Sequence, residues 1–234
     1  MDKVKEQYFN FRGVTPEFYT TYTIPAYMAK VLPHDTSRKI LDIGCGFGQT
    51  MVALRMLGYD NVSGVDISNE SIEHCGALGL NVEKVCNIDD YMENHRGEYD
   101  LIIMSHVLEH IDKSLIIPYI ISIKSMLTRD GKFLIMVPNA QSNTDCYWAY
   151  EDFTHWTLFT TGSLYLVLRA GGFEQIEFLD PYCVEGLSYA KKKIKLLLLK
   201  LYKANKMFWN RITSSSYHKP SPAIFSYEIK ALAK

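Results

Sequence analysis

The sequence predicts an α/β protein with one mostly parallel sheet that is covered by helices on both faces. Short apolar runs alternate with stretches of helical periodicity along residues 38–180, and this alternation is typical of strands that are buried on both faces. A glycine-rich turn follows the first apolar run, and polar or acidic residues follow later ones. Because ligands bind at the carboxyl ends of parallel strands, these residues predict one binding site along a single edge of the sheet.

The composition favours a single domain in a reducing compartment. A chain of 234 residues suits one domain, 1–234. The five cysteines are scattered and include no C-x-x-C pair, which argues for free thiols in the cytoplasm. Residues 1–12 lack the apolar core of a signal peptide, and no apolar stretch reaches the ~18 residues that a membrane-spanning helix needs. We therefore expect a soluble, cytoplasmic protein.

The segment Ile40–Thr50 is expected to form the first strand, a glycine turn and the start of a helix that continues through 51–57. Glycine at Gly44 and Gly46 lets a ligand approach the backbone, and the helix N-terminus favours an anionic group. The spacing G-x-G-x-G differs from the dinucleotide pattern G-x-G-x-x-G, because Gln49 stands where the last glycine would be. The match to an NAD site is therefore imperfect.

The second strand, Val62–Asp66, ends in an acid that lies about 20 residues past the glycines. A carboxylate at this position accepts hydrogen bonds from the two ribose hydroxyls of a nucleoside. The alternative role, a helix N-cap, is weaker because Ser68 or Asn69 would serve better before a helix at 70–78. Asp66 is therefore the second residue on which the predicted site depends.

The later elements continue the alternation. We expect strands at 81–85, 99–104, 132–137 and 173–179, helices at 113–127 and 161–170, and turns at 86–90 and 129–131.

Two motifs resemble the class I S-adenosyl-L-methionine (SAM) dependent methyltransferases. Asp42 stands two positions before the first glycine of the turn, as in motif I of that family, and Ser105–Ile111 resembles the segment after the family's fourth strand. The resemblance implies a single Rossmann-like, doubly wound seven-stranded sheet in the order 3-2-1-4-5-7-6. The last strand, 223–231, would be antiparallel.

The same resemblance implies SAM as the cofactor. Asn87 would meet the adenine amino group, with either acid that follows as an alternative, and Ile88 would cover the ring. The cofactor-binding residues that we expect are Asp42, Gly44, Cys45, Gly46, Phe47, Gly48, Asp66, Ile67, Asn87, Ile88, Ser105, His106 and Arg12.

Residues 1–31 mix aromatic with charged side chains and are expected to form one or two short helices over the mouth of the site. Pro16 fits the first turn of a helix after Thr15. In this interpretation the segment is an N-terminal helical lid, and Arg12 meets the carboxylate of the methionine part of SAM. The alternative is that the aromatic side chains only cap the core.

Residues 138–161 are dense in reactive and aromatic groups and are predicted to form the acceptor-binding wall. His155 is the candidate general base, with Asp152 as its orienting partner; the alternative is a structural histidine. The candidates for stacking on a sugar are Tyr147, Trp148 and Tyr150, against plain packing.

The stretch 152–160 resembles a segment of methyltransferases encoded with bacterial surface-polysaccharide (O-antigen or capsule) genes. The resemblance implies O-methylation of a sugar hydroxyl in a surface polysaccharide or a lipid-linked glycan. Two alternatives stay open: a small diffusible acceptor such as a quinone precursor, and a SAM-binding protein without transferase activity. Nucleic acid is not an expected partner, because the basic residues are confined to one element.

Residues His106–His110 also read H-x-x-E-H, a zinc-peptidase motif, which is an alternative of another class. Two histidines on one helical face bind zinc while the glutamate acts as a base. Here the motif directly follows a buried strand instead of lying within a long helix. We therefore expect no metal site, and we expect local hydrogen bonds to satisfy Glu109 and His110.

Residues 187–215 form a basic amphipathic insertion before the last strand. Between Leu187 and Arg211 there are seven lysines, one arginine and no acid, so this segment carries +8 and the rest of the chain −9. A helix at 190–209 with an apolar face opposite its lysines suits the inner face of a membrane, where the protein would be peripheral. The alternative is that the same face packs on the protein's own core or in a homodimer.

Overall fold

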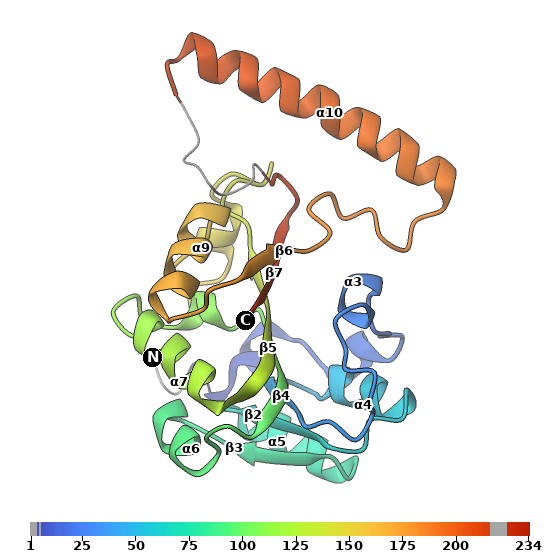
Figure 1. Ribbon diagram of the computed structural model, residues 1–234, viewed down its shortest axis with the longest axis vertical. Helices are drawn as coiled ribbons and strands as arrows, with labels where there is room; N and C mark the ends of the chain where they lie inside the picture. Colours follow the sequence, from blue (N-terminus) through green and yellow to red (C-terminus); the bar gives the residue numbers. More distant parts are fainter. Residues whose placement is uncertain (1–3, 5, 216–223) are drawn as a thin grey trace.

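The structure is a computed structural model that describes residues 4, 6–215 and 224–234, and a seven-stranded sheet runs through its centre (Figure 1). The strand order is β3-β2-β1-β4-β5-β7-β6, and β7 runs antiparallel to both of its neighbours. The strands are β1 Ile40–Ile43, β2 Val62–Asp66, β3 Asn81–Lys84, β4 Tyr99–Ser105, β5 Leu127–Pro138, β6 Ile176–Phe178 and β7 Glu228–Ala233. The predicted fold class, strand order and antiparallel last strand are confirmed.

The predicted turn at 129–131 is wrong, because these residues lie within β5. Tyr99 of β4 pairs with Leu127, and two residues later Leu101 pairs with Lys132. The strand pairing shifts its register between these two pairs, as at a β-bulge. β5 therefore begins at Leu127, before the residues that were expected to form a turn.

The last two strands also differ from their expected limits. Phe173 precedes β6 and is buried, with its ring centroid 5.7 Å from that of Phe133 in β5. It therefore packs in the core ahead of the strand instead of starting it. β7 begins at Glu228, and residue 223, where the strand was expected to start, lies outside the described residues.

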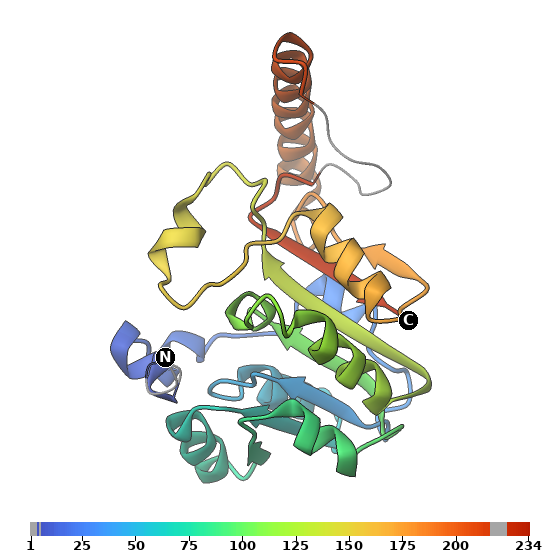
Figure 2. The ribbon, with the colours of Figure 1, turned by 90° about the vertical axis from the view of Figure 1, so that its left-hand side faces the viewer.

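Helices cover both faces of the sheet (Figures 1 and 2). One face carries α6 (Ile88–Asn94), α7 (Ile116–Met126) and α9 (Thr161–Ala170), and the other carries α3 (Ala26–Ala29), α4 (Gln49–Met56) and α5 (Asn69–Ala77). The remaining helical segments are α2 (Tyr8–Arg12), η1 (Pro16–Tyr19), η2 (Leu108–His110), α8 (Tyr147–Glu151) and α10 (Tyr189–Ile212).

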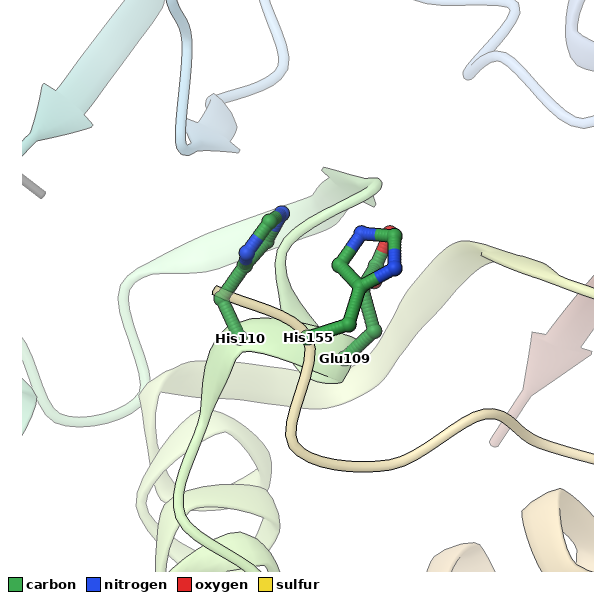
Figure 3. Close-up of side chains that lie close together, drawn as sticks. All are labelled: Glu109, His110 and His155. Carbon is green, nitrogen blue, oxygen red and sulfur yellow. The ribbon is translucent and has the colours of Figure 1, made fainter. Parts of the chain in front are cut away.

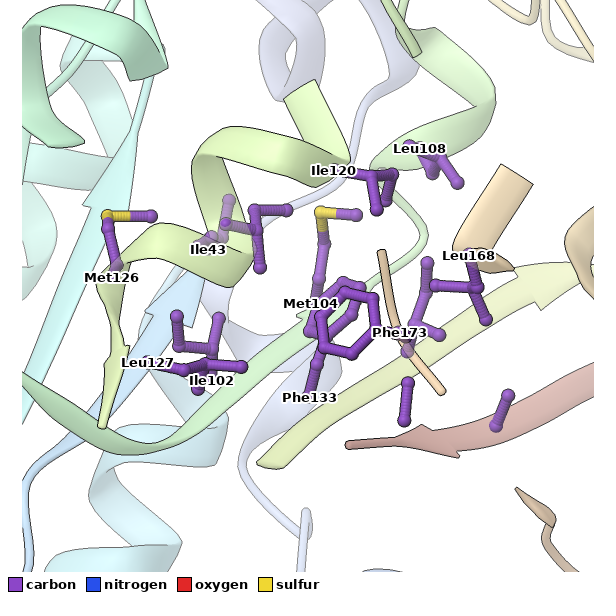
Figure 4. Packing of buried hydrophobic residues seen from close by; sticks show 14 of the residues in the cluster. Ile43, Ile102, Met104, Leu108, Ile120, Met126, Leu127, Phe133, Leu168 and Phe173 are labelled. Carbon is purple, nitrogen blue, oxygen red and sulfur yellow. The ribbon is translucent and has the colours of Figure 1, made fainter. Parts of the chain in front are cut away.

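Alternate residues of the central strands point to opposite faces, as strand geometry requires. In β4, Ile102 and Met104 belong to the cluster beneath α7 and α9, whereas Leu101 and Ile103 belong to the cluster beneath α3 and α4. Figure 4 shows the first of these clusters between the sheet and α7. Because both faces are packed, the strand ends are held on a rigid base.

Side-chain caps explain where two helices begin. Ser68 accepts a hydrogen bond from the Ser71 N–H at the start of α5, so of the two predicted cap candidates, Ser68 and Asn69, it is Ser68 that caps the helix. Asn87 caps α6 in the same way, because its Oδ1 accepts from the Asp89 N–H at 3.1 Å. The predicted turn at 86–90 is therefore the start of a helix.

The basic helix α10 stands apart from the sheet (Figures 1 and 2), and none of its residues is buried. It contacts the body through the Tyr202 hydroxyl, which donates to Asn143 Oδ1 at 3.1 Å, and through Lys195 Nζ, which donates to the Cys183 carbonyl at 2.8 Å. Its apolar side chains, between 56% and 61% exposed, are Ile194, Leu197, Leu198, Leu201 and Phe208.

The apolar face of α10 is therefore not covered by the described part of the chain, and packing on the protein's own core is not what the structure shows. Among the described residues, no helix is both long enough and apolar enough to cross a membrane.

Candidate active site

The carboxyl ends of β1 and β2 and the turn after β4 open onto a cavity of about 710 Å³, a size typical of sites for small organic molecules. Six of the predicted cofactor-binding residues line it: Gly44, Asp66, Ile67, Asn87, Ile88 and His106. The others are not among its lining residues: Asp42, Cys45, Gly46, Phe47, Gly48, Ser105 and Arg12.

The turn after β1 depends on glycines with positive φ, 71° at Gly44 and 77° at Gly48. A side chain at Gly44 would put its Cβ 2.2 Å from Cγ2 of Val107. The protein's own packing therefore requires this glycine, besides any ligand that approaches the backbone. The Gly46 N–H donates to Asp66 Oδ2 at 2.9 Å, which ties the turn to the end of β2.

Asp66 lines the cavity with its carboxylate held by the backbone. Oδ1 accepts from the Ser68 N–H at 2.8 Å, and Oδ2 accepts from the Gly46 N–H. Burial raises the pKa of Asp66, while these backbone donors oppose that shift. Each oxygen keeps a further lone pair, which a bidentate contact with two ribose hydroxyls requires.

Asp42 lies within β1 and is 3% exposed. Burial, followed by the nearby negative charge of Asp66, raises the pKa of Asp42 to about 7. Asp42 does not line the cavity, in contrast to the direct cofactor contact that the sequence resemblance implied.

The N-terminal segment reaches the cavity through Tyr8 and Phe9 of α2, which both line it. The Phe9 and Phe47 rings lie 4.5 Å apart, so α2 packs on the glycine turn. Figure 2 shows the N-terminal segment and the loop that carries α8 on the same side of the sheet. Pro16 starts η1 directly after Thr15, as predicted.

Asp152 joins α2 to the segment that follows α8. Its Oδ2 accepts from the Tyr8 hydroxyl and from Arg12 Nη1, both at 2.6 Å, and its Oδ1 accepts from the N–H and the hydroxyl of Thr154. Burial acts to raise the pKa of Asp152, but the hydrogen bonds from Thr154 and Tyr8 hold it well below its usual value. Arg12, predicted to meet the cofactor, is instead paired with Asp152.

The chain turns sharply after β4, because His106 has a left-handed backbone with φ of 55°. Its Nε2 lies 2.9 Å from Glu228 Oε1, and its Nδ1 lies 3.4 Å from Glu109 Oε1. Burial lowers the pKa of His106, but the contacts with Glu109 and Glu228 outweigh it and raise the pKa to about 10. The two carboxylates therefore favour the protonated form of the ring.

The predicted base His155 does not line the cavity. Its Nδ1 lies 2.5 Å from the Trp148 carbonyl, whereas its Nε2 lies 3.7 Å from Asp152 Oδ2, which is too far for a hydrogen bond. The Trp148 carbonyl, and not Asp152 as predicted, therefore orients the ring. The predicted stacking residues Tyr147, Trp148 and Tyr150 do not line the cavity either.

Tyr8, Thr154 and Trp156 line the cavity, and they lie in the predicted lid (1–31) and acceptor-binding wall (138–161), although none of them was a predicted cofactor-binding, catalytic or stacking residue. The pattern D-x-T at 152–154 was an available signal, because the Thr154 N–H donates to Asp152 Oδ1 at 3.0 Å in the manner of an Asx turn. Tyr8 carried no such signal, since only tertiary packing brings it to the site.

The H-x-x-E-H segment does not form a peptidase site. Its last residues make the short turn η2, and His106 contacts Glu228 while His110 Nδ1 lies 2.8 Å from Thr154 Oγ1. The expectation that local hydrogen bonds satisfy Glu109 is wrong. Glu109 is fully buried, and neither of its carboxylate oxygens has a hydrogen-bond partner in the described part of the chain.

A family model described as a methyltransferase domain matches residues 18–177, which is more than half of the chain. The chain is 33% identical over 103 residues to the ubiquinone biosynthesis O-methyltransferase of Actinobacillus pleuropneumoniae, a match that covers 40% of this chain and 43% of that protein. The match thus spans less than half the length of that relative. Its name points to ubiquinone biosynthesis, so the predicted link to polysaccharide-cluster enzymes gains no support.

Two solved structures show the same fold. A SAM-dependent methyltransferase from Archaeoglobus fulgidus aligns with a TM-score of 0.66 at 21% identity, over 97% of this chain and 98% of that chain. An N-methyltransferase from Haemonchus contortus, in complex with S-adenosylhomocysteine, aligns with a TM-score of 0.64 at 18% identity, over 99% of this chain and 59% of that chain.

The Asp152 contacts predict how firmly α2 is held over the cavity. Replacing Asp152 with Ala removes the acceptor for both Tyr8 and Arg12, so amide hydrogen exchange across residues 8–14 should become roughly 10-fold faster or more, the effect of losing charged hydrogen bonds. Mass spectrometry of deuterated peptides measures this. The exposed acid Asp60 is the control, since Asp60→Ala should change nothing there. Unchanged exchange in Asp152→Ala would mean that other contacts hold α2.

Proposed function

The chain belongs to the methyltransferase domain family and is a SAM-dependent methyltransferase, and from this premise we propose that it methylates a hydroxyl oxygen of a small, lipophilic aromatic acceptor. One observation carries this proposal: the cavity wall beside η2 and the lid is mostly apolar and aromatic. Its residues are Tyr8, Phe9, Ile111, Leu115 and Trp156, together with the polar residues His110, Asp112 and Thr154.

The cofactor end of the cavity fits SAM. Asp66 offers a carboxylate for the ribose hydroxyls, and Ile67 and Ile88 supply apolar surface for the adenine ring. The Asn87 side chain is engaged through its Oδ1, which leaves its amide N–H₂ group for a ring nitrogen of adenine. The Oδ1 atom keeps a second lone pair, so it can also accept from the adenine amino group, which is the contact that the sequence resemblance implied.

The named relative supports an oxygen acceptor. It is an O-methyltransferase of ubiquinone biosynthesis, although the shared region is under half of its length. A phenolic hydroxyl has a pKa near 10, as in tyrosine, so it gives up its proton far more readily than a sugar hydroxyl. An aromatic acceptor therefore needs less help from the protein than the glycan predicted from the sequence.

The chemistry is an in-line displacement. A lone pair of the acceptor oxygen forms a bond to the methyl carbon, the carbon–sulfur bond breaks with its electrons moving to sulfur, and the hydroxyl proton is lost. Proximity supplies up to about 7–11 kcal/mol, and a positioned proton acceptor adds about 10² to 10⁴-fold. The His155 ring lies 4.7 Å between centroids from that of His110, which lines the cavity, and we place proton loss at this pair.

Asp66 should account for much of the affinity for SAM. Asp66→Asn removes the charge that accepts the ribose hydroxyls, and we expect the dissociation constant for SAM to rise about 10- to 100-fold, the equivalent of about 1.5–3 kcal/mol. Titration calorimetry measures it, with Asp60→Asn as the control. An unchanged constant, or a wild-type protein that binds NADH and not SAM, would contradict the cofactor site.

A panel of acceptors tests the proposed substrate class. With labelled SAM, catechols and prenylated phenols should give methylated product, with kcat/KM at least about 10-fold above that of nucleotide sugars and oligosaccharides. The exposed rings of Tyr147 and Tyr150 beside the site keep a sugar acceptor as the second candidate. Product from sugars alone would overturn the aromatic acceptor in favour of the glycan.

We also propose that α10 rests on an anionic membrane surface, from which a lipophilic acceptor would enter. The helix exposes its apolar face, and its segment carries eight basic residues and no acid. Attraction to anionic lipid contributes about 1 kcal/mol for each basic residue near the surface. Trp209, which is 55% exposed, suits the interface between lipid and water.

Liposome co-sedimentation tests this contact. The wild type should pellet with anionic vesicles and not with neutral ones. The double variant Leu197→Glu with Leu201→Glu should lower the bound fraction at least about 10-fold, because it places charge on the apolar face that would enter the membrane. The control is Leu57→Glu, an exposed leucine at the end of α4. Absence of lipid-dependent pelleting contradicts the proposal. If the wild type is a dimer and the double variant a monomer, the apolar face of α10 is a subunit contact instead.

A further inference from the structure

A cluster of three side chains behind the cavity has the composition of a metal site. Glu109, His110 and His155 each present a ligand atom, and these atoms all lie within 4.8 Å of one another. Figure 3 shows the two imidazole rings and the carboxylate side by side. Glu109 and His110 come from η2 directly after β4, and His155 comes from the loop after α8. His110 lines the cavity, so the cluster borders the proposed acceptor site.

The Glu109 carboxylate lacks the compensation that a buried charge requires. It is fully buried, and within the described residues no donor makes a hydrogen bond to either oxygen. Its contact with a basic group is with His106, whose Nδ1 lies 3.4 Å from Glu109 Oε1. The Nε2 atom of the same ring lies closer to Glu228, at 2.9 Å from its Oε1. A buried carboxylate without close partners costs several kcal/mol. A cation bound beside Glu109 would remove that cost.

The hydrogen bonds around His110 determine which ring nitrogen holds the proton. The Thr154 hydroxyl lies 2.6 Å from Asp152 Oδ1, and the carboxylate can only accept, so the hydroxyl donates its single proton to Asp152. The same hydroxyl oxygen, 2.8 Å from His110 Nδ1, must therefore accept from the ring. In the neutral ring the lone pair of His110 is consequently on Nε2.

His155 is arranged in the same way. Its Nδ1 lies 2.5 Å from the Trp148 carbonyl, which can only accept, so Nδ1 carries the proton and Nε2 carries the lone pair. Histidines that bind metals usually donate one ring N–H to an oxygen and ligate through the other nitrogen. Both histidines of the cluster therefore have the tautomer and the outer partner that metal ligands need.

We infer that Glu109, His110 and His155 bind a divalent first-row transition-metal ion. Two imidazoles and one carboxylate suit Zn²⁺, Mn²⁺ or Fe²⁺ better than Mg²⁺ or Ca²⁺, which prefer oxygen ligands alone. These three ligands differ from those of a peptidase site in H-x-x-E-H, where the two histidines of the motif would bind the metal. The left-handed turn at His106 sends that ring to Glu228, and His155 takes its place from a distant part of the chain.

The role of the ion, though not its binding, rests on the proposed O-methylation. Three protein ligands leave a coordination position open, and the acceptor hydroxyl oxygen would occupy it beside His110. A bound ion would lower the pKa of that hydroxyl and so favour loss of its proton to solvent water before the oxygen attacks the methyl carbon. With the ion bound, His110 and His155 would act as ligands and not as bases. This role would replace both the predicted role of His155 and the proton loss that is placed at this pair above.

Metal binding is tested directly on the full chain after removal of metals with a chelator. Titration with Zn²⁺ should give about one ion per chain, and Co²⁺ should produce visible absorption bands of a low-coordinate site. Glu109→Gln, which keeps the shape of the side chain, and His155→Ala should each weaken Zn²⁺ binding at least about 100-fold. The exposed His34→Ala is the matched control and should bind like the wild type. Circular dichroism and SAM titration confirm that each variant is folded.

The results separate this inference from the proposed function. Chelation should lower turnover of a phenol at least about 100-fold and leave SAM binding intact, with recovery on adding Zn²⁺ or Mn²⁺. Failure to bind Zn²⁺, Mn²⁺ and Co²⁺, or binding that survives His155→Ala but is lost in His106→Gln, overturns the inference. Metal binding without any methylated phenol supports the site and contradicts the proposed acceptor alone.

Discussion

The register of β1 between β2 and β4 is the constraint on which the rest of the structure depends. Ile43 pairs with Val65 on one side and with Met104 on the other, so the three strands end at the same level. The residues that come next are the glycine turn, Asp66 and His106. Because both faces of the sheet are packed, a slip of one residue would move every side chain of β1 from one packed layer into the other. The core therefore holds the cofactor edge in place.

Asp152 extends this rigid edge to segments that are distant in sequence. Its carboxylate accepts from Tyr8 and Arg12 of α2 and from Thr154, and the Thr154 hydroxyl in turn accepts from His110. One buried charge thus determines both where α2 lies over the cavity and which nitrogen of His110 carries a proton. Hydrogen bonds to a charged acceptor are short and strong, which suits this double role.

Four buried or partly buried carboxylates in and around the cavity differ in how their charge is compensated. Asp66 accepts from two backbone N–H groups, and Asp152 accepts from three side chains and one N–H. Glu228 lies 2.9 Å from His106 and 3.4 Å from Lys230. Glu109 has only a long contact with a histidine that it shares with Glu228. Among these four carboxylates, Glu109 is the one whose oxygens accept no hydrogen bond within the described residues, which is why we propose it as a metal ligand.

The sequence by itself determined the alternating strands and helices and the edge where we propose that SAM binds, and its resemblance to the methyltransferases implied the strand order. Apolar periodicity and strand-end residues are local features, and Gly44 and Asp66 each follow their strand directly in the chain. Only the tertiary structure decided the partners of Arg12, which is 140 residues from Asp152, and the cluster that joins Glu109 to His155. These contacts depend on the backbone turn at His106 and on how the loop after α8 packs, and no spacing along the chain encodes either.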